Sequence, residues 1–274
     1  MALTQLQRTV CRLLAANRVA SGESYVAGGV ALNELIAASR ISRDVDVFHD
    51  TDQALAASWE ADRRALDAGG YRVTIIRERP TLIEAEVAAG AERVRLEWAR
   101  DSAFRFFPLV RHDDLGLTLH PFDLATNKVL ALVGRLEVRD WVDVIASDAR
   151  IQPLGYLAWA ACAKDPGFGP RAILEGAARS GRYSAEEVAE LAFDGPPPDA
   201  GHLARKWHRL LDAATEVVSL LPVEEVGACV LTADGQLFRG STVTLVEALR
   251  ERSMVYHHGR IRGALPRLVD AGRF

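Results

Sequence analysis

The spacing of apolar residues changes about halfway along this chain of 274 residues. Up to about residue 150, short apolar runs alternate with stretches in which apolar residues recur every three or four positions. This alternation predicts strands and helices in turn, and therefore an α/β (α+β) domain built on a mixed sheet. Beyond residue 150 the helical spacing dominates, which predicts a mostly helical second domain. We therefore expect two domains, 1–150 and 151–274.

Individual elements follow from the same pattern, and glycine pairs, prolines and Asp-Gly dipeptides mark where they end. The predicted helices are 4–17, 30–38, 52–68, 121–147 in two pieces, 154–164, 171–179, 185–193 and 202–220. The predicted strands are 25–27, 44–48, 71–77, 81–87 and 93–99. Near the C-terminus, 226–231 and 236–239 flank Asp234-Gly235 and are expected to form a small β-hairpin.

The most informative stretch is a glycine pair followed by two aspartates. Gly28 and Gly29 stand between a strand and a helix, where the backbone can approach a ligand and free N–H groups attract an anion. Asp44 and Asp46 are two apart in a β-branched run, so a strand projects both from one face. Paired carboxylates repel each other unless a cation lies between them. A phosphate cradle beside a cation site is what handling a nucleoside triphosphate with Mg²⁺ requires.

Simpler interpretations remain open for both features. The glycine pair could form a tight turn and nothing more. An Asp-x-Asp on an exposed strand end is commonly solvated. Val45, Val47 and Phe48 argue instead for a strand that runs through a core, where unpaired carboxylates are costly.

These residues resemble the first motif of the AbiEii-type nucleotidyltransferases, known as toxins of abortive-infection and toxin–antitoxin systems. The family's Gly-Gly-x-Ala-Leu stands here at 28–32, and its Arg-x-Ser-x-Asp-x-Asp stands at 40–46. A second block, 122–132 followed by 139–144, is similar to the family's Asp-Leu-x-x-x-Lys and Arg-Asp-x-x-Asp. Two blocks in the right order are more specific than either alone, and the resemblance covers about residues 20 to 150.

The resemblance implies transfer of a nucleoside monophosphate from a nucleoside triphosphate to an acceptor hydroxyl, with Mg²⁺ as cofactor. Asp44 and Asp46 would be catalytic residues and metal ligands. The residues that it assigns to nucleotide binding are Gly28, Gly29, Ser42, Arg43 and Lys128. It also makes a tRNA 3′ end or another RNA a candidate acceptor, and a cognate antitoxin a candidate partner.

Two metal ions held between protein and triphosphate usually require a third carboxylate from a neighbouring strand. Glu97 is the strongest candidate, because alternation places it on the strand face opposite Leu96 and Trp98. Glu84 and Glu86 on the preceding strand alternate in the same way and remain rivals. In the family's scheme the third carboxylate deprotonates the acceptor hydroxyl, and here it would join Asp44 and Asp46 as a metal ligand.

Lysine is rare in this arginine-rich chain, so Lys128 inside a motif indicates a specific role. Its ammonium could reach the triphosphate, or it could snorkel from an apolar helix towards solvent. Asp140 could line the nucleotide site as a catalytic residue, as in the family, or pair with Arg139 or Arg135. Asp123 is expected to cap the helix that it begins.

Composition limits the classes of protein to which this chain could belong, but it does not identify a function. The formal net charge of −4 gives no global reason to expect nucleic-acid binding. No apolar run is long enough to span a membrane, and the 3 cysteines are too few and scattered for a disulfide framework, so the cytoplasm is the expected compartment. Arginines interleaved with aromatics at 205–209 and 256–262 suit contact with RNA, or they form a solvated helix face and a basic loop.

Three functions remain open from the sequence. The first is an enzyme that modifies RNA, protein or a small molecule, with residues 151–274 selecting the acceptor. The second is a non-catalytic module that binds nucleotide or a partner protein on the same fold. The third, a small-molecule nucleotidyltransferase, differs from the first only in its acceptor. The intact glycines, aspartates and Lys128 favour an enzyme, since a decayed site would be expected to lose one of them.

Overall fold

The computed structural model describes residues 3–267 and divides into two compact units, which we describe separately. The first unit comprises the described residues up to Ala103, with Leu109–His120 and Ala192–Gly195. The second comprises Phe104–Pro108, Pro121–Leu191 and the described residues from Pro196 onward. The chain therefore passes between the units several times.

A seven-stranded mixed sheet forms the centre of the first unit, with the strand order β4-β5-β6-β3-β1-β9-β8. Its strands are β1 (Ser24–Ala27), β3 (Asp44–His49), β4 (Arg72–Arg79), β5 (Leu82–Ala89), β6 (Glu92–Arg100), β8 (Val110–His112) and β9 (Gly116–Thr118). Strand β3 runs parallel to β6 and antiparallel to β1. Strands β4, β5 and β6 are joined as successive antiparallel pairs. This mixed sheet confirms the expected α/β class.

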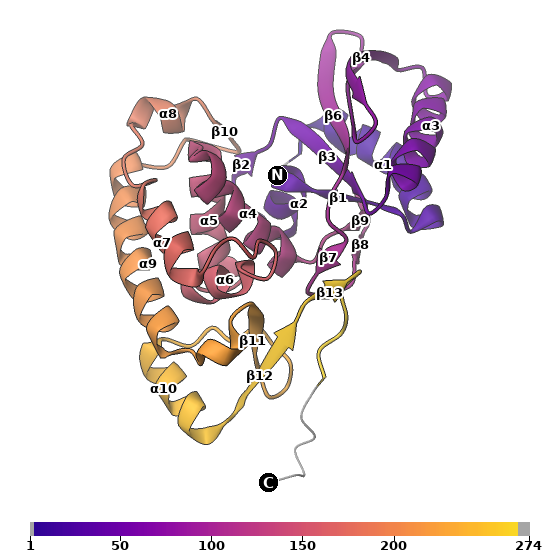
Figure 1. The fold of residues 1–274 in the computed structure, drawn as a ribbon. Helices are drawn as coiled ribbons and strands as arrows, with labels where there is room; N and C mark the ends of the chain where they lie inside the picture. Colours follow the sequence, from indigo (N-terminus) through magenta and orange to yellow (C-terminus); the bar gives the residue numbers. More distant parts are fainter. Residues whose placement is uncertain (1–2, 268–274) are drawn as a thin grey trace. The chain divides into compact units, whose positions relative to one another are not determined.

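Two long helices, α1 (Gln5–Ser21) and α3 (Asp52–Ala68), contact each other and β6 (Figure 1). The indole of Trp98 on β6 lies 4.8 Å from that of Trp59 on α3, between ring centroids, and donates to a buried Asp62 carboxylate at 2.9 Å. The same carboxylate accepts from Asn17 of α1 at 2.9 Å. One buried carboxylate therefore joins both helices to the apolar face of the sheet.

Most elements of the first unit agree with those expected from the sequence, although β8 and β9 were not predicted. Helix α3 has the predicted bounds, and α1 begins as expected but continues to Ser21. Helix α2 (Gly28–Leu35) begins at the first glycine itself, two residues earlier than predicted. Strand β2 (Arg40–Ile41), which pairs with β10 (Ala192–Phe193), was not predicted, because two-residue strands carry no alternation to detect.

The second unit is built around α6 (Leu154–Ala161), all eight residues of which are buried. The other helices are α4 (Pro121–Arg135), α5 (Val138–Arg150), α7 (Pro170–Ala178), α8 (Ala185–Ala189), α9 (Ala200–Leu220) and α10 (Thr242–Glu251), with a 3₁₀ turn at Val223–Glu225. Helix α6 contacts α4, α5, α7 and α9. A Cβ at Gly155 would lie only 2.7 Å from the Cβ of Val217, so this glycine permits the close crossing of α6 and α9.

The compact units differ from the sequence-based division at residue 150. Helices α4 and α5 belong to the second unit, because both pack against α6 rather than against the sheet. The predicted helix 185–193 is also shorter than expected. It ends at Ala189, and the residues after it form β10 in the first unit.

The β element near the C-terminus forms with a different partner from the one expected. Strand β11 (Ala228–Thr232) pairs over five residues with β12 (Met254–His258), which follows α10. The Asp-Gly turn does form. After it, Phe238 N donates a hydrogen bond of 3.0 Å to Val230 O, but the expected hairpin is reduced to an isolated β-bridge between Leu231 and Leu237. Two residues further on, β13 (Arg260–Ile261) pairs with β7 (Phe104–Arg105).

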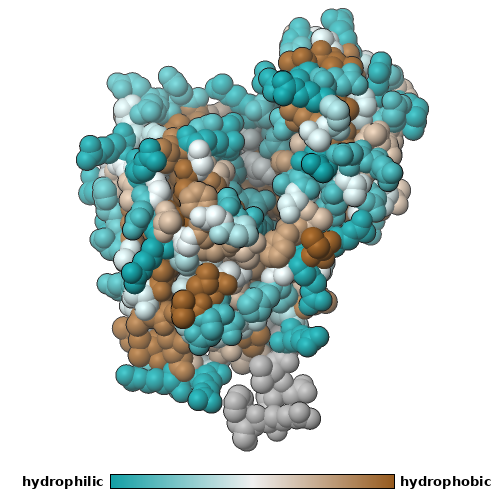
Figure 2. All heavy atoms as spheres, viewed as in Figure 1, coloured by the Kyte–Doolittle hydropathy of each residue, from teal (hydrophilic) through white to brown (hydrophobic). Residues whose placement is uncertain are grey.

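The surface of the second unit carries some exposed apolar side chains. Val223 is 78% exposed and Val243 of α10 is 69% exposed. Figure 2 shows hydrophobic residues, in brown, gathered over α10. Within residues 3–267, no helix is both long and apolar enough to cross a membrane.

Candidate active site

The glycine pair lies at the junction where β1 ends and α2 begins. Gly28 has a φ of +65°, in the left-handed region. A Cβ built on Gly28 would lie 1.8 Å from Oδ2 of Asp46, far inside any permitted contact. Any larger residue here would therefore face both backbone strain and a collision. The first turn of α2 thus begins directly against the Asp46 carboxylate.

The second glycine is crowded by a different pair of side chains. A Cβ at Gly29 would lie 2.5 Å from Nη2 of Arg40 and 2.9 Å from Oγ of Ser42. Arg40 is 4% exposed, so its guanidinium is held within the unit beside the start of α2. Ala27, the N-cap residue, provides no side-chain cap for this helix. A helix start flanked by a guanidinium and a hydroxyl is suited to phosphate oxygens.

The loop that carries Ser42 and Arg43 is fixed by Gln7, a buried residue of α1. The Gln7 amide nitrogen donates to the carbonyl of Ser42 at 2.8 Å and to that of Arg43 at 3.1 Å. Its amide oxygen accepts from Thr4 N at 2.8 Å, as part of a capping box. The N-terminal helix therefore positions the loop that follows β2.

Three carboxylates stand side by side on one face of the sheet, in consecutive strands. Asp46 of β3 is the register partner of Glu97 of β6, which in turn is the partner of Glu84 of β5. Directly paired residues point to the same face. We call Asp46, Glu97 and Glu84 the carboxylate row. Asp44 lies on the same face of β3, two residues before Asp46.

The carboxylates of this row differ in how far neighbouring positive charges offset their negative charge. Glu84 is buried and forms ion pairs with Arg95 at 3.1 Å and Arg77 at 3.9 Å. The Glu97 carboxylate forms no hydrogen bond or ion pair with the side chain of any described residue. Burial raises the pKa of Glu97, and the carboxylates of Glu84 and Asp44 raise it further against the opposing effect of nearby arginines. Glu97 is therefore the carboxylate in this row with the strongest reason to take up a proton or a cation.

The same comparison bears on the rivals for the third carboxylate. Glu86 forms an ion pair with Arg93 at 3.5 Å, and Glu84 is already held by two arginines. Glu97 stands next to Asp46 in the register, whereas Glu84 is one strand further away. The geometry therefore favours Glu97 over both alternatives.

The carboxylates on this face are the type of side chain that binds Mg²⁺. Carboxylate oxygens are the ligands that this ion prefers, and a divalent cation would offset the carboxylate repulsion that, after burial, raises the pKa of Glu97. Among residues 3–267, no three His, Cys, Asp or Glu side chains already form a group that could hold a metal. The carboxylates thus share a face without forming a complete metal site by themselves, and Mg²⁺ binding stays a prediction.

Lys128 and Asp140 lie in the second unit, where they form a buried ion-pair network between α4 and α5. The Lys128 ammonium is 2.9 Å from Oδ1 of Asp140 and 3.0 Å from Oδ2 of Asp143. Arg135 also donates to Asp140, at 2.6 and 3.0 Å. Burial acts to raise the pKa of Asp140, but Arg135 and Lys128 outweigh it and hold the pKa below its ordinary value.

This network decides between some of the alternatives left open by the sequence. The Lys128 side chain is 8% exposed, so it does not snorkel to solvent. Asp140 pairs with Arg135, while Arg139 pairs with Glu137 at 2.5 Å. The network gives both residues a structural role, and a nucleotide-binding role for either stays a prediction.

Asp123 does not cap its own helix as expected. Its buried carboxylate accepts from the backbone N–H groups of Phe106 and Phe107 at 2.8 and 3.1 Å, and it pairs with Lys164 at 2.9 Å. The carboxylate therefore anchors the segment Phe104–Pro108 within the second unit.

The two arginine-aromatic clusters of the second unit are less open than their sequences suggest. Trp207 is fully buried, so it cannot stack on a base. His257 is also buried and bonds through Nε2 to the carbonyl of Phe106 at 2.8 Å. The supposed basic loop is in fact two short strands, β12 and β13. Only the outer residues of these clusters, such as Arg260, remain exposed.

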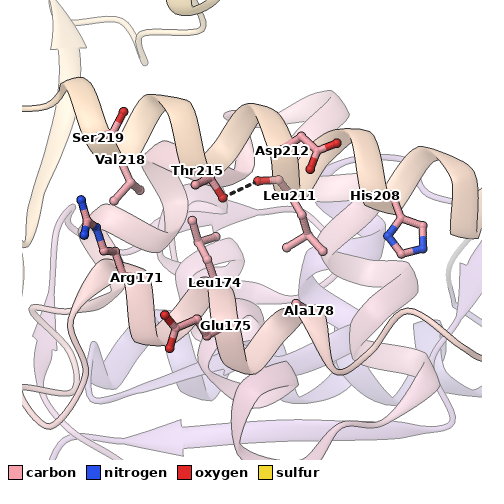
Figure 3. A pocket seen from close by; sticks show the side chains of 10 residues that line it. All are labelled: Arg171, Leu174, Glu175, Ala178, His208, Leu211, Asp212, Thr215, Val218 and Ser219. Atoms are coloured by element: carbon pink, nitrogen blue, oxygen red, sulfur yellow. Dashed lines mark hydrogen bonds between the residues drawn. The ribbon is translucent and has the colours of Figure 1, made fainter.

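A groove of about 510 Å³ lies between α7 and α9 of the second unit, and none of the predicted site residues lines it. Leu174 of α7 and Leu211 of α9 face each other across it, with His208 at one end (Figure 3). Thr215 turns its hydroxyl back to the Leu211 carbonyl at 2.8 Å rather than into the groove. We assign no chemistry to it.

Most of the predicted site residues are therefore brought together in one place. Gly28, Gly29, Ser42, Asp44, Asp46 and Glu97 all belong to the first unit and meet where β1, β3 and β6 lie side by side. Sequence reasoning missed two supporting residues, Arg40 and Gln7. Arg40 stood within the quoted motif, but its burial beside Gly29 is visible only in three dimensions.

Comparison with known proteins finds likeness in structure alone, since no family model and no curated protein matches the sequence. JHP933 from Helicobacter pylori aligns over 79% of this chain and 95% of its own, with a TM-score of 0.50 and 14% identity. MenT4, a nucleotidyltransferase toxin from Mycobacterium tuberculosis, aligns over 80% of this chain and 85% of its own, with a TM-score of 0.49 and 15% identity. At such identities the likeness concerns the fold.

Replacing Glu97 by glutamine should stabilise the protein in the absence of divalent cations. The folded-state pKa of Glu97 lies above its ordinary value, so ionised Glu97 destabilises the fold at pH values above that folded pKa. The Glu97→Gln variant should therefore melt at a higher temperature than the wild type at neutral pH. The difference should vanish below about pH 4.3, the ordinary glutamate pKa. Glu86→Gln is the control, because Glu86 has an arginine partner. A lower melting temperature for Glu97→Gln than for this control would contradict the account.

Replacing Lys128 by methionine should unfold the second unit more easily. The change removes the ammonium that pairs with the buried carboxylates of Asp140 and Asp143, which should lower the free energy of unfolding by about 3–5 kcal/mol. Lys206→Met is the matched control on α9, and it should have a much smaller effect. Urea denaturation measures both. An unchanged midpoint for Lys128→Met would argue against a structural role and in favour of triphosphate binding.

Proposed function

We propose that this chain is a Mg²⁺-dependent nucleotidyltransferase, which moves a nucleoside monophosphate from a nucleoside triphosphate to an acceptor hydroxyl. One observation carries the proposal: Asp44, Asp46 and Glu97 share a sheet face, and a left-handed glycine brings the start of a helix against one of them. The resemblance of the two sequence motifs to the AbiEii-type enzymes points to the same reaction.

In this proposal the start of α2 receives the triphosphate. Gly28 and Gly29 let the phosphates approach the backbone, and the N–H groups of the first helical turn point towards them. Ser42 and Arg43 lie on the loop that Gln7 holds in place. Arg40, whose guanidinium is next to Gly29, adds a positive charge at the same point.

Asp44, Asp46 and Glu97 would hold Mg²⁺, which when bound neutralises the phosphate charge and orients the α-phosphate. The acceptor oxygen forms a bond to the α-phosphorus as the bond from that phosphorus to the bridging oxygen breaks. Pyrophosphate leaves with the electron pair. Glu97, the register partner of Asp46 on the neighbouring strand, takes the proton of the acceptor hydroxyl as a general base.

The acceptor that we favour is RNA, with a tRNA 3′ end as the specific candidate. Together with the family resemblance this would make the chain a toxin of a toxin–antitoxin or phage-defence system, controlled by a cognate antitoxin. A small-molecule acceptor is the second candidate, since nothing in the carboxylate row distinguishes one hydroxyl from another. A non-catalytic nucleotide- or protein-binding module is the third.

Asp46→Asn should abolish transfer while leaving the fold intact. The change keeps the shape of the side chain beside Gly28 but removes a negative charge that a metal ion needs. The test incubates each labelled nucleoside triphosphate with Mg²⁺ and total RNA and measures label in macromolecules, with calorimetry of Mg²⁺-nucleotide binding in parallel.

The control for this test is Asp52→Asn, an exposed aspartate of α3 outside the carboxylate row. It makes the same charge change and should keep full activity. If Asp46→Asn retained both nucleotide affinity and labelling, the proposed site would be wrong. Nucleotide binding without labelling of any acceptor by the wild type would favour the non-catalytic module.

A further inference from the structure

A row of apolar side chains crosses the sheet directly beside the carboxylate row. Phe48 follows Asp46 by two residues on β3, so alternation places both side chains on the same face. Phe48 pairs in register with Tyr25 of β1 and with Ala99 of β6. Ala99 pairs in turn with Leu82 of β5, and paired residues point to the same face. We call Tyr25, Phe48, Ala99 and Leu82 the apolar row.

The ring of Phe48 is held by a buried neighbour but is itself partly exposed. The ring centroids of Tyr25 and Phe48 are 6.4 Å apart, with 30° between the ring planes. Tyr25 is 1% exposed, and its hydroxyl donates to Oδ1 of Asp50 at 3.4 Å. Phe48 and Leu82 both keep part of their surface in contact with solvent. The apolar row therefore presents a positioned aromatic ring that a ligand can reach.

The core that the sheet forms with α3 does not involve Phe48. The core side of β3 carries Val45 and Val47, which are fully buried. Val47 is the register partner of Trp98, on which Trp59 of α3 packs. Phe48 lies on the opposite face, because it is an odd number of residues from both valines. A large aromatic side chain thus stands on the face of the proposed active site.

The order of groups along the strands matches the order of groups in a nucleoside triphosphate. Strand β1 is antiparallel to β3, and Ala27 is the register partner of Asp46. The helix start at Gly28 therefore lies beyond Asp46, on the side away from Phe48. The proposed phosphate site, the carboxylate row and the apolar row follow one another in that order. In the substrate, pyrophosphate, α-phosphate and nucleoside follow one another in the same order.

We propose that Phe48 stacks on the base of the nucleoside triphosphate, and that the apolar row forms the floor of the nucleoside site. This inference rests on the proposed nucleotidyl transfer, to which it adds the residue that holds the base. Phe48 lies about 7 Å along the strand from Asp46, which leaves room for the ribose between the α-phosphate and the base. Aromatic side chains bind bases in this way because every base has a flat π-face.

The apolar row also predicts how selective the nucleoside site is. Ala99 and Leu82 carry no polar side-chain atoms. The Tyr25 hydroxyl is engaged by Asp50. The row therefore offers no hydrogen bond that would distinguish the edge of one base from that of another. Stacking alone discriminates by ring size, so purine nucleotides should bind more tightly than pyrimidine nucleotides.

A purely structural role for Phe48 is the alternative explanation. Partly exposed apolar side chains are common on protein surfaces, and Phe48 also packs on Tyr25. A structural Phe48 would contribute to the free energy of unfolding, but it would not make nucleotide affinity depend on the base. The two roles therefore differ in what they predict for ligands with and without a nucleoside.

The test measures the binding of Mg²⁺-ATP and of Mg²⁺-tripolyphosphate by calorimetry, because tripolyphosphate carries the phosphates without a nucleoside. Phe48→Leu removes the ring but keeps an apolar side chain. It should weaken ATP binding about tenfold and leave tripolyphosphate binding unchanged. Phe48→Tyr, which keeps an aromatic ring, should bind ATP as the wild type does. The wild type should also bind ATP and GTP more tightly than CTP and UTP, and this preference should shrink in Phe48→Leu.

The matched control is Tyr71→Leu, the same kind of change at a partly exposed aromatic residue between α3 and β4, outside the apolar row. Its affinity for ATP should equal that of the wild type. The inference would be overturned if Phe48→Leu bound ATP as tightly as this control does, or if it lost affinity for ATP and tripolyphosphate equally. A wild type that binds all four nucleotides equally would also count against it.

Two further outcomes separate this inference from the proposed reaction. ATP binding that depends on the Phe48 ring, without transfer to any acceptor, would leave the inference standing and contradict the reaction. Transfer whose KM for each nucleotide is the same in Phe48→Leu and in the wild type would do the reverse. Weaker use of the acceptor by Phe48→Leu at unchanged ATP affinity would place the acceptor on Phe48 and overturn the assignment to the nucleotide.

Discussion

The contact between Gly28 and Asp46 is the constraint on which the rest of the site depends. Gly28 has no Cβ, and this allows α2 to begin, directly after β1, in contact with the Asp46 carboxylate of β3. A Cβ at this position would collide with that carboxylate. The left-handed φ of Gly28 turns the chain at this point, and the side chains of Arg40 and Ser42 lie close to Gly29. The groups that we propose to bind phosphate and a cation are thereby brought within one short stretch of the fold.

The register of the sheet then determines which acids meet. Asp46, Glu97 and Glu84 stand in one row. Two arginines pair with Glu84, while burial, and then the carboxylates of Glu84 and Asp44, raise the pKa of Glu97. A raised pKa means that ionised Glu97 destabilises the fold, and in our proposal a bound cation offsets this cost.

Much of this was predictable from sequence, and the reasons for the failures are specific. Alternation located β3 and β6 and put Glu97 on the correct face, because one side of each strand is buried against helices. It could not show that Lys128 meets Asp143, because that contact depends on how α4 and α5 pack. Nor could it show that Trp207 is in the core, or that β11 pairs beyond α10 with β12. Long-range partners of this kind leave no local pattern.

The account is tested most directly by the binding of a Mg²⁺-nucleoside triphosphate to the Gly28→Ala variant, measured by calorimetry beside the wild type. A methyl group at this position must displace the Asp46 carboxylate and strain the turn, while the helices and most of the sheet are untouched. We predict a folded protein that has lost Mg²⁺-dependent nucleotide binding. A folded Gly28→Ala variant that binds the Mg²⁺-nucleotide as tightly as the wild type would contradict the central claim.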